Sequence, residues 1–309
     1  MLSIVTPGQG SQTSGMFSSW ISDKKNSEIL SNYSDLVNID LIHFGTVASQ
    51  SEITATNIAQ PLLTAMALIS FSNLDIQANP NTIFSGHSVG EFSAACFAGF
   101  FSDETAMKLV AVRGKAMADA ATSNGATGMS AVLGGDKAEV IKHIERFDLV
   151  PANVNSNGQI VASGLLSNLD KLSATPPAAT KVRKLDVAGA FHSQFMKSAE
   201  SDLEKEFSEI EMKKPTNRFI SNKDGQLVIE TVDLKNRLIS QITSPVRWDL
   251  CQARMIELGV TGMLELAPGG VLTGIAKREI PGVELFAIKS PEDITGAQAF
   301  IDKHAKINQ

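Results

Sequence analysis

Apolar and polar positions in the first hundred residues alternate between short strand-like runs and helix-like spacing. Residues 2–6 predict a buried strand that enters a loop with glycines, residues 7–12, where the backbone can approach another group closely. Residues 61–74 predict an apolar helix with Pro61 as its first helical residue, and residues 82–84 predict the next strand. This succession is typical of an α/β protein.

A second unit of structure is predicted after Ala121, where residues 122–128 read as a linker. Its expected elements, in order, are a strand at 129–133, a helix at 137–147, strands at 150–154 and 159–162, a helix at 168–174 and a strand at 182–187. This βαββαβ order is the ferredoxin-like pattern. A helix-rich pattern resumes over residues 193–207. We therefore expect a large α/β domain, residues 1–124 and 189–309, with a small ferredoxin-like subdomain, residues 125–188, inserted into it.

Composition narrows the class of protein. Of 309 residues, 43% are hydrophobic and 19% are charged, as in ordinary globular domains. The net charge of -6 disfavours a nucleic-acid-binding surface. The longest strongly apolar run, residues 94–101, falls well short of the roughly 20 residues that span a membrane, and no signal peptide is recognised. We therefore expect a cytoplasmic protein that binds neither nucleic acid nor membrane.

Cysteine and histidine usage offers no metal site. Cys96 and Cys251 lie far apart in apolar or helical surroundings and are expected to be buried, reduced thiols. The five histidines form no cluster with the spacing of metal ligands. We expect neither a metal nor a cofactor.

The strongest chemical signal is Gly86-His87-Ser88-Val89-Gly90, which lies between a predicted strand and a predicted helix. This is the context of a nucleophile elbow, where glycines relieve crowding at a sharp turn. The amide of Val89 and the positive end of the helix could stabilise negative charge beside Ser88. The predicted fold is therefore an α/β-hydrolase-like core with a parallel sheet and a nucleophile elbow, plus the inserted subdomain.

A serine nucleophile needs a base, and two histidines compete for that role. His87 adjoins Ser88, but neighbouring side chains on an elbow diverge, which favours a packed histidine there. His192 is the preferred base, because it lies at a junction between an extended segment and a helix, flanked by small residues. For an acidic third member, the sequence itself offers Asp186 or Asp249.

Arg113 interrupts the apolar stripe of a predicted helix that Ser102 or Asp103 can cap. A buried guanidinium needs an anion. Two interpretations stay open at this point: an internal ion pair with an Asp or Glu, or bidentate capture of a substrate carboxylate.

Six motifs in order resemble the malonyl-CoA:acyl carrier protein transacylases of bacterial type II fatty acid synthesis, with details most similar to actinobacterial members. They are residues 7–12 (Pro-Gly-Gln-Gly-Ser-Gln), 86–91 (Gly-His-Ser-Val-Gly-Glu), 111–114 (Ala-Val-Arg-Gly), 190–193 (Ala-Phe-His-Ser), Gln241 with 244–248 (Ser-Pro-Val-Arg-Trp), and 265–272 (Glu-Leu-Ala-Pro-Gly-Gly-Val-Leu). The matches span nearly the whole chain. The sequence departs from the family pattern at Gly270, where many members carry lysine, and at Asn157-Gly158.

The resemblance implies a ping-pong acyl transfer. Ser88 would attack malonyl-CoA with His192 as its base, and the malonyl group would then pass to the phosphopantetheine thiol of holo acyl carrier protein. Arg113 would hold the malonyl carboxylate.

The remaining roles also follow from the resemblance. Gln9 and Val89 would supply the oxyanion-hole amides, and the main-chain carbonyl of Gln241 would orient His192. Phe191 before His192 resembles malonyl-selective members, because a bulky ring would crowd a branched substrate; one methyl group is worth about 1 to 3 kcal/mol of discrimination.

An acidic carrier protein would require local basic residues on this acidic chain. The candidate pairs and triples are Lys277 with Arg278, and Lys181 with Arg183 and Lys184; each set also reads as ordinary solvated surface. We expect a monomer.

Three alternatives remain at the level of the sequence. The first is a serine esterase or thioesterase-like hydrolase that uses Ser88 and His192. The second is a patatin-like Ser-Asp enzyme with Asp224-Gly225 as its partner motif, which leaves His192 unexplained. The third is a carrier-binding protein without activity, which the joint presence of Ser88, His192 and Arg113 disfavours.

Overall fold

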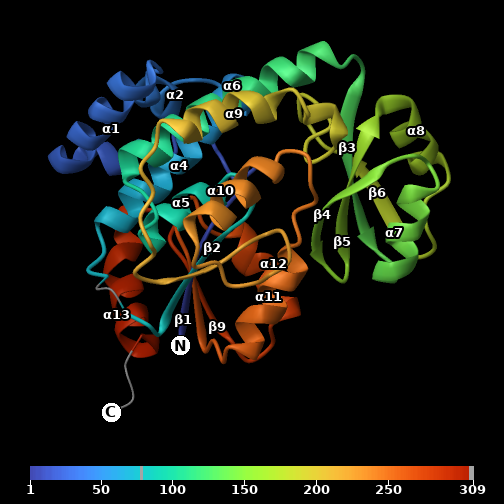
Figure 1. Ribbon diagram of the computed structural model, residues 1–309. Helices are drawn as coiled ribbons and strands as arrows, with labels where there is room; N and C mark the ends of the chain where they lie inside the picture. The colour runs from blue at the N-terminus through green and yellow to red at the C-terminus, as the bar shows by residue number, and fades with distance from the viewer. Residues whose placement is uncertain (77–78, 306–309) are drawn as a thin grey trace.

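The structure is a computed structural model that describes residues 1–76 and 79–305. A five-stranded parallel sheet forms the centre of the larger part of the molecule, with strand order β7-β2-β1-β8-β9 (Figure 1). Its strands are β1 (Leu2–Thr6), β2 (Thr82–Gly86), β7 (Arg218–Ile220), β8 (Gly262–Glu265) and β9 (Glu284–Ala287).

Helices cover both faces of this sheet. The helices outside the smaller sheet are α1 (Lys24–Val37), α2 (Leu41–Thr46), α3 (Gln50–Thr54), α4 (Thr56–Ser72), α5 (Gly90–Ala98), α6 (Asp103–Ser123), α9 (Ala199–Ser208), α10 (Thr231–Ser240), α11 (Trp248–Glu257), α12 (Val271–Glu279) and α13 (Ile294–His304). Short 3-10 turns are η1 (Trp20–Ser22), η2 (Gln194–Met196) and η3 (Pro291–Asp293).

Alternate residues of each central strand enter opposite cores. On β1, Ile4 belongs to the core formed with α4, α6 and α13, whereas Val5 packs with α11 and α12. On β2, Phe84 belongs to the same core as Ile4, and Ile83 to the same core as Val5. Both faces of these strands are therefore apolar, which explains why they read as continuous hydrophobic runs in the sequence.

A four-stranded antiparallel sheet with order β4-β5-β3-β6 forms the smaller part of the molecule. Its elements are β3 (Thr127–Gly134), α7 (Lys137–Glu145), β4 (Val150–Ser156), β5 (Gln159–Leu165), α8 (Leu166–Ala174) and β6 (Thr180–Lys184). Their order along the chain is the β-α-β-β-α-β order predicted from the sequence. Both α7 and α8 pack on one face of this sheet, around Val132 and Ile160.

The other face of the antiparallel sheet looks toward the parallel sheet. Its side chains Met129, Ala131 and Val161 line the same cavity as Ser88. The chain thus forms a cavity between the carboxyl ends of the parallel strands and the inner face of the smaller sheet. Figure 1 shows the two parts of the molecule side by side.

Two local expectations were wrong. Helix α4 begins at Thr56, so Pro61 lies inside it rather than at its first residue; because Pro61 is near the start, it removes only one early hydrogen bond of the helix. The linker is shorter than residues 122–128, since α6 continues to Ser123 and β3 begins at Thr127. The hydroxyls of Thr122 and Ser123 donate to the carbonyls of Ala118 and Asp119, one turn back, so their hydrogen-bonding capacity is met within the last turn of α6.

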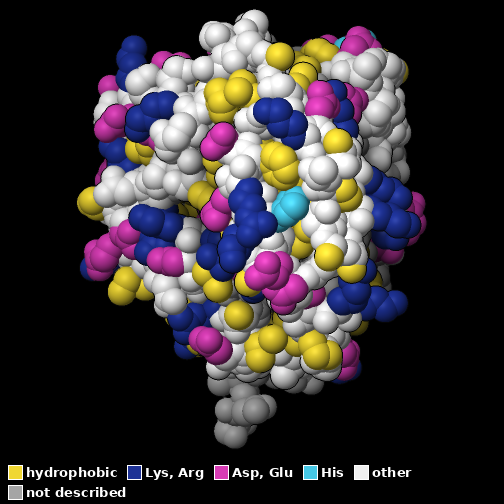
Figure 2. Space-filling view, turned by 90° about the vertical axis from the view of Figure 1, so that its right-hand side faces the viewer, with side chains coloured by type: hydrophobic (Ala, Val, Ile, Leu, Met, Phe, Trp, Pro, Cys, Tyr) yellow, Lys and Arg dark blue, Asp and Glu magenta, His cyan; other side chains and the backbone are white. Residues whose placement is uncertain are grey.

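Among the helices of residues 1–76 and 79–305, none combines the length and apolarity that a membrane crossing requires. The space-filling view shows Lys and Arg side chains interspersed with Asp and Glu over the face turned toward the viewer (Figure 2).

Candidate active site

The strand-to-helix turn after β2 holds Ser88 in a strained conformation. Its φ of 53° lies in the left-handed region, which non-glycine residues adopt at a cost of about 1 to 3 kcal/mol. Gly86 and Gly90 make the turn possible: a Cβ on Gly86 would lie 2.1 Å from the carbonyl carbon of Gly90, and one on Gly90 would lie 2.4 Å from the carbonyl oxygen of Thr6. The backbone crossing therefore requires glycine at both positions.

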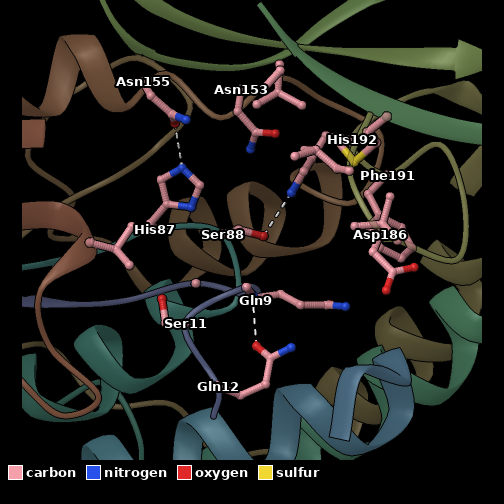
Figure 3. A pocket seen from close by; sticks show the side chains of 18 of the residues that line it. Gln9, Ser11, Gln12, His87, Ser88, Asn153, Asn155, Asp186, Phe191 and His192 are labelled. Carbon is pink, nitrogen blue, oxygen red and sulfur yellow. Dashed lines mark hydrogen bonds between the residues drawn. The ribbon is translucent and has the colours of Figure 1, made fainter. Parts of the chain in front are cut away.

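Ser88 and His192 form a hydrogen-bonded pair at the floor of the cavity (Figure 3). Ser88 Oγ lies 2.8 Å from His192 Nε2, and His192 Nδ1 lies 2.7 Å from the main-chain oxygen of Gln241. A carbonyl oxygen only accepts, so Nδ1 carries the proton and Nε2 is free to accept the proton of Ser88. Burial, followed by the charge of Arg113, lowers the pKa of His192 to about 3. The imidazole is therefore a neutral base at physiological pH.

The acidic residues suggested for the third position do not contact His192. Asp249 instead pairs with Arg247 and Lys137. Asp186 lines the cavity and is exposed, and Figure 3 shows it below Phe191, apart from the Ser88–His192 pair. The position of a third member is occupied by the carbonyl of Gln241.

Arg113 lies beneath Ser88 with 0% of its surface exposed. One terminal nitrogen donates to Gln60 Oε1 at 2.7 Å, and the other donates to Gln241 Oε1 at 2.8 Å and to Ser88 Oγ at 3.3 Å. Among the described residues it forms no direct ion pair, and its Nε has no partner. Burial lowers the pKa of Arg113 to about 9, an effect that the charge of Glu91 opposes. The internal ion pair considered from the sequence is absent from the part of the chain that is described.

The two backbone amides expected at an oxyanion hole lie on segments next to Ser88. Val89 follows Ser88 directly and precedes the first turn of α5, while Gln9 lies in the loop after β1 and lines the cavity. Within the described residues, neither amide donates to another protein group. Their hydrogen-bonding capacity is therefore not used by the described protein groups.

The cavity above Ser88 has a volume of about 310 Å³. Phe191 lines it next to His192, with 5% of its surface exposed. His87 points away from Ser88 and its Nε2 lies 2.8 Å from Asn155 Oδ1, so it links the elbow to β4 as a packed histidine (Figure 3). Burial lowers the pKa of His87 as well.

Two buried amide side chains at the site were missed by the sequence analysis. Asn222 Oδ1 accepts from the amide of Ser88 at 2.8 Å, and its Nδ2 donates to the carbonyl of Gly86 at 2.6 Å. Gln60 accepts from Arg113. A polar residue inside the apolar run of α4 was a usable signal for Gln60; Asn222 follows a three-residue strand, β7, that gave no clear pattern.

The candidate basic residues are exposed and lie close in sequence to the cavity lining. Lys277 and Arg278 end α12, whose Ile275 lines the cavity. Lys181, Arg183 and Lys184 lie on β6, which leads to the lining residue Leu185.

Residues 4–286 match the model of the acyl transferase domain, and the chain belongs to this family. Malonyl CoA-acyl carrier protein transacylase of Mycobacterium tuberculosis is 45% identical over 297 residues, which cover 95% of this chain and 98% of that protein. The protein of the same name from Staphylococcus aureus is 32% identical over 304 residues, covering 95% and 97%.

Solved structures agree with this assignment. The crystal structure of MCAT from Mycobacterium tuberculosis superposes with a TM-score of 0.93 at 44% identity, covering 96% of this chain and 99% of that one. A malonyl-transacylase in complex with a type II PKS acyl-carrier protein gives a TM-score of 0.87 at 27% identity, covering 96% and 99%. The resemblance predicted from six motifs is thereby confirmed.

Proposed function

We propose that this protein is a malonyl-CoA:acyl carrier protein S-malonyltransferase of fatty acid biosynthesis, acting through a malonyl-Ser88 intermediate. The observation that carries the proposal is Arg113, a fully buried guanidinium without a carboxylate partner, 3.3 Å from Ser88 Oγ. Such a cation selects an acyl group that brings its own carboxylate. The transacylase names of the relatives support the same substrate and acceptor.

The first half-reaction loads the enzyme. Ser88 Oγ attacks the thioester carbonyl of malonyl-CoA while its proton passes to His192 Nε2. The tetrahedral intermediate collapses, the C–S bond breaks, and the thiol of CoA leaves with the proton from His192. The product is a malonyl ester on Ser88.

The second half-reaction reverses these roles. The phosphopantetheine thiol of holo acyl carrier protein gives its proton to His192 and attacks the ester carbonyl. The C–O bond to Ser88 breaks, and Ser88 recovers the proton. The Val89 and Gln9 amides stabilise the oxyanion in both halves, and Gln241 keeps His192 in the reactive tautomer.

Arg113 and Phe191 set the choice of acyl group. The guanidinium fixes the malonyl carboxylate and so limits the approach of water, which favours transfer over hydrolysis. The ring of Phe191 beside His192 disfavours a branched α-carbon, with a discrimination of about 1 to 3 kcal/mol per methyl group.

Intact-mass measurement after incubation with malonyl-CoA tests the proposal. The wild-type protein should gain one malonyl group, lose it to holo acyl carrier protein, and show no gain in Ser88→Ala. Arg113→Ala should lower kcat/KM for malonyl-CoA by about 100-fold or more, because it leaves a carboxylate unpaired in a buried site, and affect acetyl-CoA far less. Equal losses for both thioesters would defeat the carboxylate role.

The serine hydrolase remains the second candidate, because it needs the same Ser88–His192 pair. A hydrolase that acts on neutral esters gives no role to the buried Arg113. Release of free malonate without a stable adduct on Ser88 would favour hydrolysis over transfer.

The acceptor and the architecture complete the proposal. We assign the carrier-protein surface to Lys277 and Arg278, and to the β6 residues Lys181, Arg183 and Lys184. The large domain comprises residues 1–124 and 189–309 with an α/β-hydrolase-like core; the elbow after β2 supports that description. Residues 125–188 form a ferredoxin-like subdomain, in agreement with the order β4-β5-β3-β6. The protein is a cytoplasmic monomer that needs no cofactor.

A further inference from the structure

Glu91 is a buried carboxylate to which the mechanism above gives no role. It lies in the first turn of α5, three residues after Ser88, and 1% of its surface is exposed. Its carboxylate accepts hydrogen bonds from the main-chain amide of Asn222, at 2.6 Å, and from Nε2 of the Gln241 side chain. Within the described residues it makes no direct ion pair. The side chain of Ser221 also stabilises its charged form. A buried charge held by neutral groups alone calls for an explanation.

The Gln241 side chain joins Glu91 to Arg113. Its Oε1 accepts from Arg113 at 2.8 Å, and its Nε2 donates to Glu91 and to the carbonyl oxygen of Ser88 at 3.0 Å. Guanidinium is only a donor and an ionised carboxylate is only an acceptor, so the amide of Gln241 has a single orientation that satisfies both. The main-chain oxygen of the same residue accepts from His192.

This arrangement separates the two charges by one amide. A carboxylate in direct contact would occupy the fork of Arg113 and compete with any substrate carboxylate. With Gln241 between them, the negative charge of Glu91 still raises the pKa of Arg113 and so favours its charged form. The guanidinium itself donates only to neutral groups, those of Gln60, Gln241 and Ser88.

We propose that Glu91 is a positioning residue for malonyl selection: its ionised carboxylate fixes the Gln241 amide, which in turn holds Arg113 charged and aligned beside Ser88. This inference rests on the proposed malonyl transfer. It gives Glu91 no contact with the substrate and no proton to move.

Glu91→Gln removes the charge and inserts a donor into this chain of hydrogen bonds. If the NH2 group of the new glutamine faces Gln241 Nε2, two donors oppose each other, and Gln241 must turn its own NH2 group toward Arg113. If the NH2 group instead faces the main-chain amide of Asn222, that amide loses its acceptor. We expect the ratio of kcat/KM for malonyl-CoA to kcat/KM for acetyl-CoA to fall about tenfold or more, since unpaired buried donors are costly. Ser88 should still acylate from acetyl-CoA, because the Ser88–His192 pair is intact.

Asp249→Asn is the matched control. It also converts a largely buried carboxylate into an amide, but Asp249 bonds Arg247 and Lys137 and touches neither Gln241 nor Arg113. The Asp249→Asn protein should be less stable than the wild type, with the same ratio of kcat/KM for malonyl-CoA to kcat/KM for acetyl-CoA. A control that lowers the ratio as much as Glu91→Gln would overturn the assignment to Glu91.

A pH profile of the wild-type protein gives a readout that needs no variant. Burial raises the pKa of Glu91 to about 7. Among the titratable groups around it, the pKa of Arg113 is about 9, that of His192 about 3, and burial raises that of Cys251 on α11 and lowers that of His87. Glu91 is thus the group that gains a proton as pH falls through neutrality.

The ratio of kcat/KM for malonyl-CoA to kcat/KM for acetyl-CoA should therefore decrease as the pH is lowered from about 8.5 to about 6. The malonyl carboxylate itself stays ionised over this range. Glu91→Gln should lack this change. A ratio that is constant over this range in the wild-type protein, or preserved in a folded Glu91→Gln, would refute the role of Glu91. Failure of the wild-type protein to form a malonyl adduct at all would instead refute the proposed function.

Discussion

The side chain of Asn222 ties both ends of the elbow together, and its removal should weaken the fold and the reaction at once. Asn222→Ala leaves the buried amide of Ser88 without its acceptor, at about 1 to 3 kcal/mol, and removes the bond to Gly86, worth about 0.5 to 1.5 kcal/mol. The sum is about 1.5 to 4.5 kcal/mol of unfolding free energy. Ser88, at φ 53°, then also loses a contact that holds its strained backbone.

The assay combines urea unfolding with the rate of Ser88 acylation. Trp20 and Trp248 are buried, so their fluorescence should report the transition. A shift of Ser88 by about 1 Å should slow acylation on the order of 100-fold. The control is Asn124→Ala, which removes an exposed amide that donates two hydrogen bonds at the end of α6 and should cost about 0.5 to 1.5 kcal/mol. If Asn222→Ala keeps its urea midpoint and its acylation rate, the turn is held by its backbone alone and the reasoning is wrong.

Two further predictions concern the base and the acceptor. Because burial lowers the pKa of His192 to about 3, its basic form prevails above that pH. The rate of Ser88 acetylation by acetyl-CoA, measured by stopped flow or quenched flow, should therefore be constant between about pH 5 and pH 8. A rate that follows a single ionisation near pH 6.5 would contradict this. Reversing the charges of Lys277 and Arg278 should raise KM for acyl carrier protein at low salt and leave loading from malonyl-CoA unchanged; an unaltered KM would mark the pair as ordinary surface charge.

The elements that the sequence analysis predicted best are those with either an unbroken apolar run or a clear alternation of apolar and polar side chains. The strands β1 and β2 are apolar on both faces, and the smaller sheet alternates between its two faces, so both parts were anticipated. β7 was missed because three residues are too few to show a period. Pro61 was misplaced because the helix begins with five residues, Thr56 to Gln60, whose mixture of polar and apolar side chains gives no start signal.

Ser88, His192 and Arg113 could be singled out because each breaks a pattern in its surroundings. Glycines flank Ser88 at fixed spacing, few histidines compete with His192, and Arg113 interrupts an apolar stripe. Asn222 and Glu91 break no pattern. Their importance comes from which backbone amides they meet in space, and the sequence carries no spacing rule for contacts between elements that are more than a hundred residues apart.

The expectation of an acidic third member failed for an electrostatic reason that the structure makes visible. A carboxylate facing His192 Nδ1 would also lie close to the buried Arg113, whose field already lowers the pKa of His192. It would pair with the guanidinium and raise the pKa of the base. A main-chain carbonyl orients the imidazole without adding charge, so the histidine stays neutral. Under the malonyl transfer proposed above, it also leaves Arg113 without a protein carboxylate partner and so able to pair with a substrate carboxylate, which accounts for an uncharged orienting group.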